Sequence, residues 1–173
     1  MTTTLLLTVV GADRVGLVEA LAKRVAAAGG NWESSRMARL AGQFAGIVLV
    51  TVDDRRADAL VGELRALEGS GLQVMARTIQ PPASATGGER VQLALTGADR
   101  PGIVRDVSQI LASQGVNVEE LETALSSAPM SGESLFTAQA TLTVPASVAL
   151  GDLRSALEAL GGELMVDLSK LSQ

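Results

Sequence analysis

The residues of this chain best suited to chemistry lie in one six-residue loop that occurs twice. The sequence Gly-Ala-Asp-Arg-x-Gly occupies residues 11–16 and again residues 97–102. Asp13 and Asp99 stand within a residue or two of an expected helix start, where a carboxylate accepts backbone N–H bonds. Gly16 and Gly102 fall in the expected first helical turn, where Gly costs about 0.5–1 kcal/mol relative to Ala. Gly would be worth that cost if another group came close to the backbone at this point. That group could be a packed part of the protein or a small ligand whose carboxylate meets free N–H groups, and the sequence favours neither explanation over the other.

Two asparagines add a second kind of candidate. Asn31 and Asn117 follow the helix that each loop begins. A side-chain amide can donate to the carboxylate of an amino acid and accept from its ammonium group, although Asn after Gly is also a common turn residue. We expect each Asn to lie near its loop if the strands share one sheet. Arg14 and Arg100 are weaker candidates for holding an anion, because an Arg after an Asp is more often solvated or paired.

The composition excludes several classes of function. The chain has no Cys and no His, which removes disulfides, zinc sites and His-dependent nucleophilic catalysis. No carboxylate pair suggests acid–base catalysis, and neither nucleotide-binding Gly motif is present. We therefore expect a non-enzymatic protein without metal or cofactor.

Charge and hydropathy narrow the class of partner. The net charge is −5, which argues against binding to the phosphates of a nucleic acid. The aromatic residues are only one Trp and two Phe, too few to stack on bases. No apolar run approaches membrane-spanning length, and the first residues lack the features of a secretion signal. We expect a soluble cytoplasmic protein that binds no membrane.

The repeat extends well beyond the loop and sets the domain organisation. A shift of 86 residues aligns 8–31 with 94–117 without a gap, which indicates two copies of one structural unit. Residues 81–89 are rich in Pro and Gly and have no periodic pattern, as in a linker. The prediction is a first domain at 1–80, a linker at 81–89 and a second domain at 90–173.

Hydrophobic periodicity gives the same element order in both halves, strand–helix–strand–strand–helix–strand. This is the ferredoxin-like order, so the predicted fold class is α+β, with two helices on one face of a four-stranded antiparallel sheet in each domain. In the first half we expect strands at 5–10, 32–40, 44–52 and 72–79, with helices from 17 and after Asp53. In the second half we expect strands at 91–96, 118–125, 135–144 and 163–168, with helices at 101–114 and 148–160.

Strand parity distinguishes the two sheets. The sheet face without helices is apolar in the first half, with Leu6, Val10, Ile47 and Leu49, whereas the corresponding positions of the second half are polar. We predict that another sheet, a helix or a second subunit covers the apolar face. The second hairpin is longer and contains residues 128–132, which we interpret as a loop extension, with a flap over a site as the alternative.

The motifs now support a resemblance to a known family. Gly-Ala-Asp-Arg-Val-Gly-Leu-Val at 11–18, Gly-Ala-Asp-Arg-Pro-Gly-Ile-Val at 97–104 and the Gly-x-Asn at 29–31 and 115–117 resemble the loops of tandem ACT-domain proteins. The stretch at 33–40, followed by Gly42-x-Phe44, is similar to the glycine cleavage system transcriptional repressor group. Val15 departs from this pattern, because the second copy has Pro101.

The resemblance implies regulation rather than chemistry. ACT domains typically bind amino acids at an interface between domains, through the first strand–helix loop and nearby strand residues. Glycine and serine are the first ligands to test, and the repressor group implies action through a protein partner such as a transcription factor. We expect the regulator to be a homodimer. Carried over position by position, the ligand-binding residues would be Asp13, Gly16, Leu17, Asn31, Asp99, Gly102, Ile103 and Asn117.

Two alternatives stay open beside an amino-acid-responsive regulator. One is a ligand-free protein–protein interaction module that uses the apolar sheet face of the first half. The other, which fold analogy alone supports, is a small acylphosphatase-like enzyme that uses Arg14 or Arg100 with an Asn.

Overall fold

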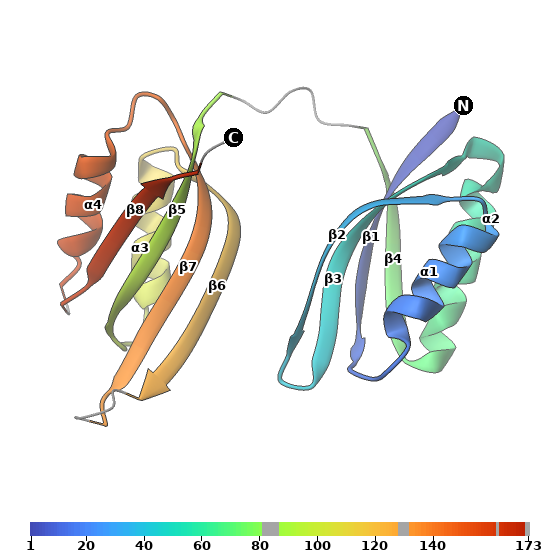
Figure 1. Ribbon diagram of the computed structural model, residues 1–173, viewed down its shortest axis with the longest axis horizontal. Helices are drawn as coiled ribbons and strands as arrows, with labels where there is room; N and C mark the ends of the chain where they lie inside the picture. Colours follow the sequence, from blue (N-terminus) through green and yellow to red (C-terminus); the bar gives the residue numbers. More distant parts are fainter. Residues whose placement is uncertain (81–86, 128–131, 162, 172–173) are drawn as a thin grey trace. The chain divides into compact units, whose positions relative to one another are not determined.

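In a computed structural model of the chain, residues 1–80, 87–127, 132–161 and 163–171 are described. The chain divides into two compact units, Met1–Ala83 and Ser84–Gln173, and each shows the same architecture (Figure 1). Most of the expected linker and the expected hairpin extension at 128–131 lie outside the described residues. Glu89, the last residue of the expected linker, already begins a strand.

The first domain has the predicted order of elements. It consists of β1 (Thr2–Ala12), α1 (Leu17–Ala27), β2 (Asn31–Leu40), β3 (Gln43–Asp53), α2 (Asp54–Arg65), the short 3-10 helix η1 (Ala66–Ser70) and β4 (Leu72–Ile79). The sheet is antiparallel in the order β2-β3-β1-β4, and both α-helices cover one of its faces (Figure 1).

Local sequence explains where these elements begin and end. Gly29 adopts a positive φ after α1, which lets the chain leave the helix and enter β2. Asp53 caps α2 as expected, because its side chain accepts a hydrogen bond of 2.9 Å from the backbone N–H of Arg55.

The second domain repeats this plan. Its elements are β5 (Glu89–Ala98), α3 (Ile103–Ser113), β6 (Asn117–Ser127), β7 (Ser134–Val144), α4 (Leu150–Glu158) and β8 (Met165–Lys170). The sheet order is β6-β7-β5-β8, again antiparallel. Pro101, expected in the first helical turn, lies two residues before α3 begins.

Each domain has its own hydrophobic core between sheet and helices, and the predicted strand parity is correct. Val48, Val50 and Val52 of β3 are buried toward the helices, as are their counterparts Leu142 and Val144 of β7. On the helix-free face of the first sheet, Val10, Ile47 and Met75 are 40%, 46% and 56% exposed. Covering of this apolar face by another element or subunit stays a prediction.

The α-helices of the described residues contain 9 to 12 residues each. Among these residues, no helix is both long enough and apolar enough to cross a membrane.

Candidate functional site

The two repeated loops are anchored in the same way at the end of the first strand of each domain. The backbone N–H of Asp13 donates to the carbonyl oxygen of Gly42 at 2.9 Å, and that of Asp99 donates to Ser134 at 2.9 Å. Each loop therefore lies beside the hairpin of its own domain and leads directly into α1 or α3.

The structure corrects our reason for the glycines at the helix starts. Gly16 and Gly102 are the N-cap residues of α1 and α3, with φ of 91° and 85°. A Cβ added at Gly16 would come no closer than 3.9 Å to another group, the Glu19 carboxylate, so no tight neighbour excludes it. Glycine is needed because L-residues with side chains rarely adopt this left-handed conformation. Close packing by the chain itself, one of the two reasons that we considered, is therefore wrong for Gly16, whereas close approach by a ligand stays a prediction.

The expected capping role of the loop aspartates is also wrong. Neither α1 nor α3 receives a capping hydrogen bond from a side chain, so first-turn N–H groups are left for water or a ligand. Asp13 instead forms an ion pair of 3.3 Å with Arg39 of β2. The Asp99 carboxylate has no hydrogen bond or ion pair to any residue in the described part of the chain, so it is available to a ligand.

The first helical residues have a structural role. Leu17 and Ile103 are buried members of the two hydrophobic cores. Any contact of the Leu17 side chain with a ligand would compete with core packing, whereas Ile103 also borders a pocket described below.

The asparagines do not lie near the loops, which corrects our expectation. Asn31 pairs with Thr51 of β3, and Thr51 pairs with Thr4 of β1, whereas the loop follows Gly11. The seven steps from Thr4 to Gly11 span about 23 Å of strand. The second domain has the same register, in which Asn117 pairs with Thr143 and Thr143 with Arg90. Within one domain, a single amino acid cannot touch both the loop and the Asn.

Asn31 takes part in a structural cluster that we did not predict. Asn31 Nδ2 and Thr51 Oγ1 both donate to Glu33 Oε1, each at 2.7 Å. The hydrogen bond from Thr51, followed by that from Asn31, lowers the pKa of Glu33 below its usual range. This cluster holds the bulged start of β2 against β3.

The second domain has a related cluster at the same register. The carboxylate of Glu119 accepts a short hydrogen bond from Thr143 and one of 3.0 Å from Arg90 Nε. The hydrogen bond from Thr143 is the main cause that lowers the pKa of Glu119. The sequence Asn-x-Glu, which occurs at 31–33 and again at 117–119, could have predicted these two clusters.

The loop arginines are paired, as expected for Arg after Asp. Arg14 donates a short hydrogen bond to the carbonyl oxygen of Ser70. Arg100 Nη1 lies 2.7 Å from Asp106, which also pairs with Arg105 at 2.8 Å. The hydrogen bonds from Arg100 and then Arg105 lower the pKa of Asp106 below its usual range. Both loop arginines are therefore engaged with groups of the protein, and a phosphate would have to displace these groups to bind them.

An open pocket lies beside the second loop, which we call the Asp99 pocket. Its volume is about 620 Å³, its open mouth included. Three of the four second-domain candidates line it, and Asn117 does not. The lining residues are Asp99, Arg100, Gly102, Ile103, Val104, Thr123, Ala124, Leu125 and Phe136. The pocket thus combines an available carboxylate, an uncapped helix start and an apolar wall.

The two domains differ in the strand residues beside these loops. With the 86-residue shift, Arg39 of the first domain corresponds to Leu125 of the second, and Met37 corresponds to Thr123. Arg39 reaches the loop and pairs with Asp13. Leu125 has no charge and cannot form the ion pair with Asp99 that Arg39 forms with Asp13.

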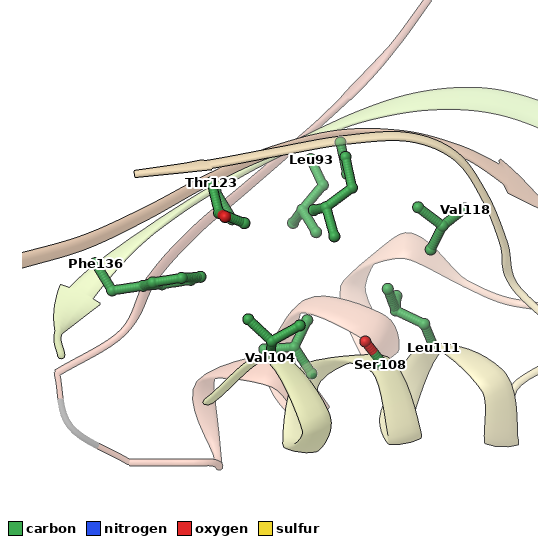
Figure 2. Close-up of a pocket in the computed structure, with 11 residues that line it drawn as sticks. Leu93, Val104, Ser108, Leu111, Val118, Thr123 and Phe136 are labelled. Atoms are coloured by element: carbon green, nitrogen blue, oxygen red, sulfur yellow. The ribbon is translucent and has the colours of Figure 1, made fainter. Parts of the chain in front are cut away.

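A narrow crevice, which we call the β6 crevice, separates α3 from the edge of the second sheet and was not predicted. Figure 2 shows Val104 and Leu111 of α3 facing Val118 and Thr123 of β6 across it. In the first domain the larger Met37 packs over Gly46, where a Cβ would clash with it. Where the first domain pairs Met37 with Gly46, the second pairs Thr123 with Ala138. This difference between the two halves was the sequence signal for the crevice.

Comparison with known proteins agrees with this architecture. Residues 3–76 match an ACT domain, and residues 89–162 match another ACT domain. The chain is 30% identical over 166 residues to the glycine cleavage system transcriptional repressor of Escherichia coli (strain K12), which covers 92% of this chain and 85% of that protein.

A solved structure extends the likeness to the whole chain. A crystal structure of an unknown protein from Galdieria sulphuraria is 31% identical, with a TM-score of 0.82, and the match covers 99% of this chain and 100% of that one. With two matched domains and a relative that is 30% identical over 92% of the chain, the chain belongs to the ACT-domain family, with two such domains in tandem.

Proposed function

We propose that this chain is a non-enzymatic cytoplasmic regulator that responds to a small amino acid and acts through a protein partner. A homodimer and a transcription factor as partner are part of this proposal. The named relative represses transcription of the glycine cleavage system, as its name states. The chain is acidic, with a net charge of −5, which favours action through another protein over direct contact with DNA.

The second-domain loop is the best-supported ligand site. The observation that carries the proposal is the Asp99 carboxylate, which has no partner among the described residues and lies in a pocket beside the uncapped start of α3. Asp99 would receive the ammonium group of an amino acid, and the first-turn N–H groups would receive its carboxylate. Leu125 and Phe136 would border the bound amino acid. Glycine and serine are the first ligands to test because the relative is a repressor of the glycine cleavage system.

The first-domain loop is a weaker site in this proposal. Arg39 already pairs with Asp13 at 3.3 Å, and an incoming ammonium group would have to displace it. Asn31 and Asn117 lie at the other end of their domains, so they would contribute to a ligand only from a neighbouring domain or subunit.

A thermal-shift screen against the common amino acids tests the proposal. A ligand at 100 times its dissociation constant stabilises the protein by about 2.7 kcal/mol, which gives a readily measured rise in melting temperature. Asp99→Asn is expected to abolish the shift, whereas the matched variant Asp13→Asn is expected to keep it. A full response in Asp99→Asn would overturn the assignment of the site.

A ligand-free interaction module is the second candidate. The exposed Val10, Ile47 and Met75 on the helix-free face of the first sheet favour it, because apolar patches of this kind mark protein-binding surfaces. If no amino acid shifts the melting temperature, this candidate replaces the first.

The acylphosphatase-like enzyme has little geometric support. Arg14 and Arg100 are paired with other groups, and each Asn lies far along the strands from its loop. Hydrolysis of an acyl phosphate by the purified protein, lost in Arg14→Ala or in Arg100→Ala, would support this alternative.

A further inference from the structure

The β6 crevice and the Asp99 pocket are continuous with each other. Val104, Thr123 and Phe136 line both of them. From these shared residues the crevice follows α3 past Ser108 to Leu111 (Figure 2). Leu111 lies seven residues beyond Val104, which is about 10 Å along the helix. A molecule held at the start of α3 therefore has a path into the crevice.

The crevice is narrow and its lining is apolar. Nine of its eleven lining residues are apolar, and the other two are Ser108 and Thr123. The space free for a water-sized sphere is about 20 Å³, where one water molecule needs about 10–15 Å³ and several polar partners. Val104 and Leu121 at its opening are 42% and 52% exposed, so packing does not hold them rigidly. Such a space suits an unbranched aliphatic chain better than water.

The first domain fills the corresponding space with its own side chains. With the 86-residue shift, Trp32 stands at the position of Val118 and Met37 at the position of Thr123. Both Trp32 and Met37 pack against the first hydrophobic core. The second domain has the same strands and helices but a smaller side chain at each of these two positions. An unbranched chain in the β6 crevice would restore the contacts that a methionine side chain makes in the first domain.

We propose that the β6 crevice is the side-chain subsite of the Asp99 pocket, and that the ligand is an amino acid with an unbranched apolar side chain, such as methionine or norleucine. Asp99 holds the ammonium group, the start of α3 holds the carboxylate, and the side chain passes Thr123 into the crevice. This inference rests on the proposed function and narrows it, because the side chains of glycine and serine are too short to enter the crevice.

The contacts in the crevice set the expected order of affinities. Burial of one methylene group raises affinity about fourfold, and the norleucine side chain has four carbon atoms. After the loss of its rotational freedom, we expect norleucine to bind at least about tenfold more tightly than glycine. Leucine and isoleucine contain the same atoms in branched form and would overpack the crevice, so we expect them to bind at least about fivefold more weakly than norleucine.

Calorimetric titration of the full chain with these four amino acids tests the proposal. Norleucine is expected to bind most tightly, with the ratios given above. If glycine binds and norleucine binds no more tightly, or if isoleucine equals norleucine, the subsite is overturned and the Asp99 site stands. If none of the four binds, the proposed function and the subsite are both overturned.

Two variants that fill the crevice locate the binding of the side chain. Ser108→Met adds a long side chain from α3 and leaves the strands unchanged. Thr123→Met combined with Ala138→Gly reproduces the pair that the first domain has at these positions. Each is expected to lower the ratio of norleucine affinity to glycine affinity at least about fivefold.

The matched control is Ser126→Met, which adds the same side chain to the opposite face of β6, since neighbouring strand residues point to opposite faces. It is expected to leave the ratio unchanged. Circular dichroism of each variant checks that the domain is folded, and the two filled variants change different elements, so one failure to fold leaves the other to decide. A ratio that stays at the wild-type value in a folded filled variant would overturn the proposal.

Discussion

Replacement of Gly16 by Ala tests our explanation of the repeated loop. Gly16 has a φ of 91° at the start of α1, and a Cβ there would meet no group closer than 3.9 Å. The change should therefore act through backbone strain alone. A left-handed conformation costs an L-residue about 1–2 kcal/mol, and the lower entropy of the unfolded Ala chain offsets about 0.5 kcal/mol of this. The expected net loss of stability is about 1 kcal/mol.

Gly62→Ala in α2 is a matched control with the opposite sign. Gly62 has no positive φ, and a Cβ there would meet nothing within 4 Å outside its own helix. Ala in such a helix interior is expected to stabilise the domain by about 0.5–1 kcal/mol. The two Gly→Ala changes should therefore differ by roughly 2 kcal/mol.

Urea denaturation followed by Trp32 fluorescence measures both effects in the first domain alone. Trp32 is the single Trp of the chain and packs against the first core. With a slope of about 1 kcal/mol per molar urea, the midpoint should fall by about 1 M in Gly16→Ala and rise by 0.5–1 M in Gly62→Ala. A Gly16→Ala protein as stable as the wild type would refute the strain argument.

Two further predictions use the same fluorescence assay. Gly46→Ala should destabilise the first domain by about 1–3 kcal/mol, because the new Cβ would overlap Met37 and the carbonyl oxygen of Arg36; an unchanged midpoint would contradict the packing. Glu33 has a lowered pKa in the folded state, so its contribution to stability is present above about pH 4.3 and is lost as the pH falls through the folded pKa. The difference between wild type and Glu33→Gln should therefore shrink between pH 6 and pH 3, and a difference independent of pH would show that the Thr51 and Asn31 hydrogen bonds do not hold the carboxylate.

The fold could be predicted from the sequence because each local signal agreed with the next. The repeat predicted two equivalent domains, and the alternation in β3 correctly placed Val48, Val50 and Val52 toward the helices. Asp53 was correctly expected to cap α2. These inferences depend on short-range periodicity, which a strand or helix imposes directly on its sequence.

The site could be predicted only in part, because it depends on register and backbone angles. Asn31 follows α1, whose eleven residues return the chain about 16 Å toward the start of β1, so the Asn had to lie far from the loop. The length of α1 was available as a signal and was not used. The positive φ of Gly16 was not accessible, because a Gly required by conformation and a Gly required by close packing have the same letter.

The unequal partners of the two aspartates also escaped sequence analysis. Asp13 and Asp99 stand in nearly identical loops, and the difference between them comes from Arg39 and Leu125, which are distant in sequence. Comparison of the two halves along β2 and β6, rather than along the loop alone, would have found it.

Calorimetric titration with the amino acid that gives the largest thermal shift tests the central claim most directly. The account predicts one binding site per chain, lost in Asp99→Asn and kept in Asp13→Asn. Two equivalent sites per chain, or binding that survives Asp99→Asn and is lost in Asp13→Asn, would contradict it.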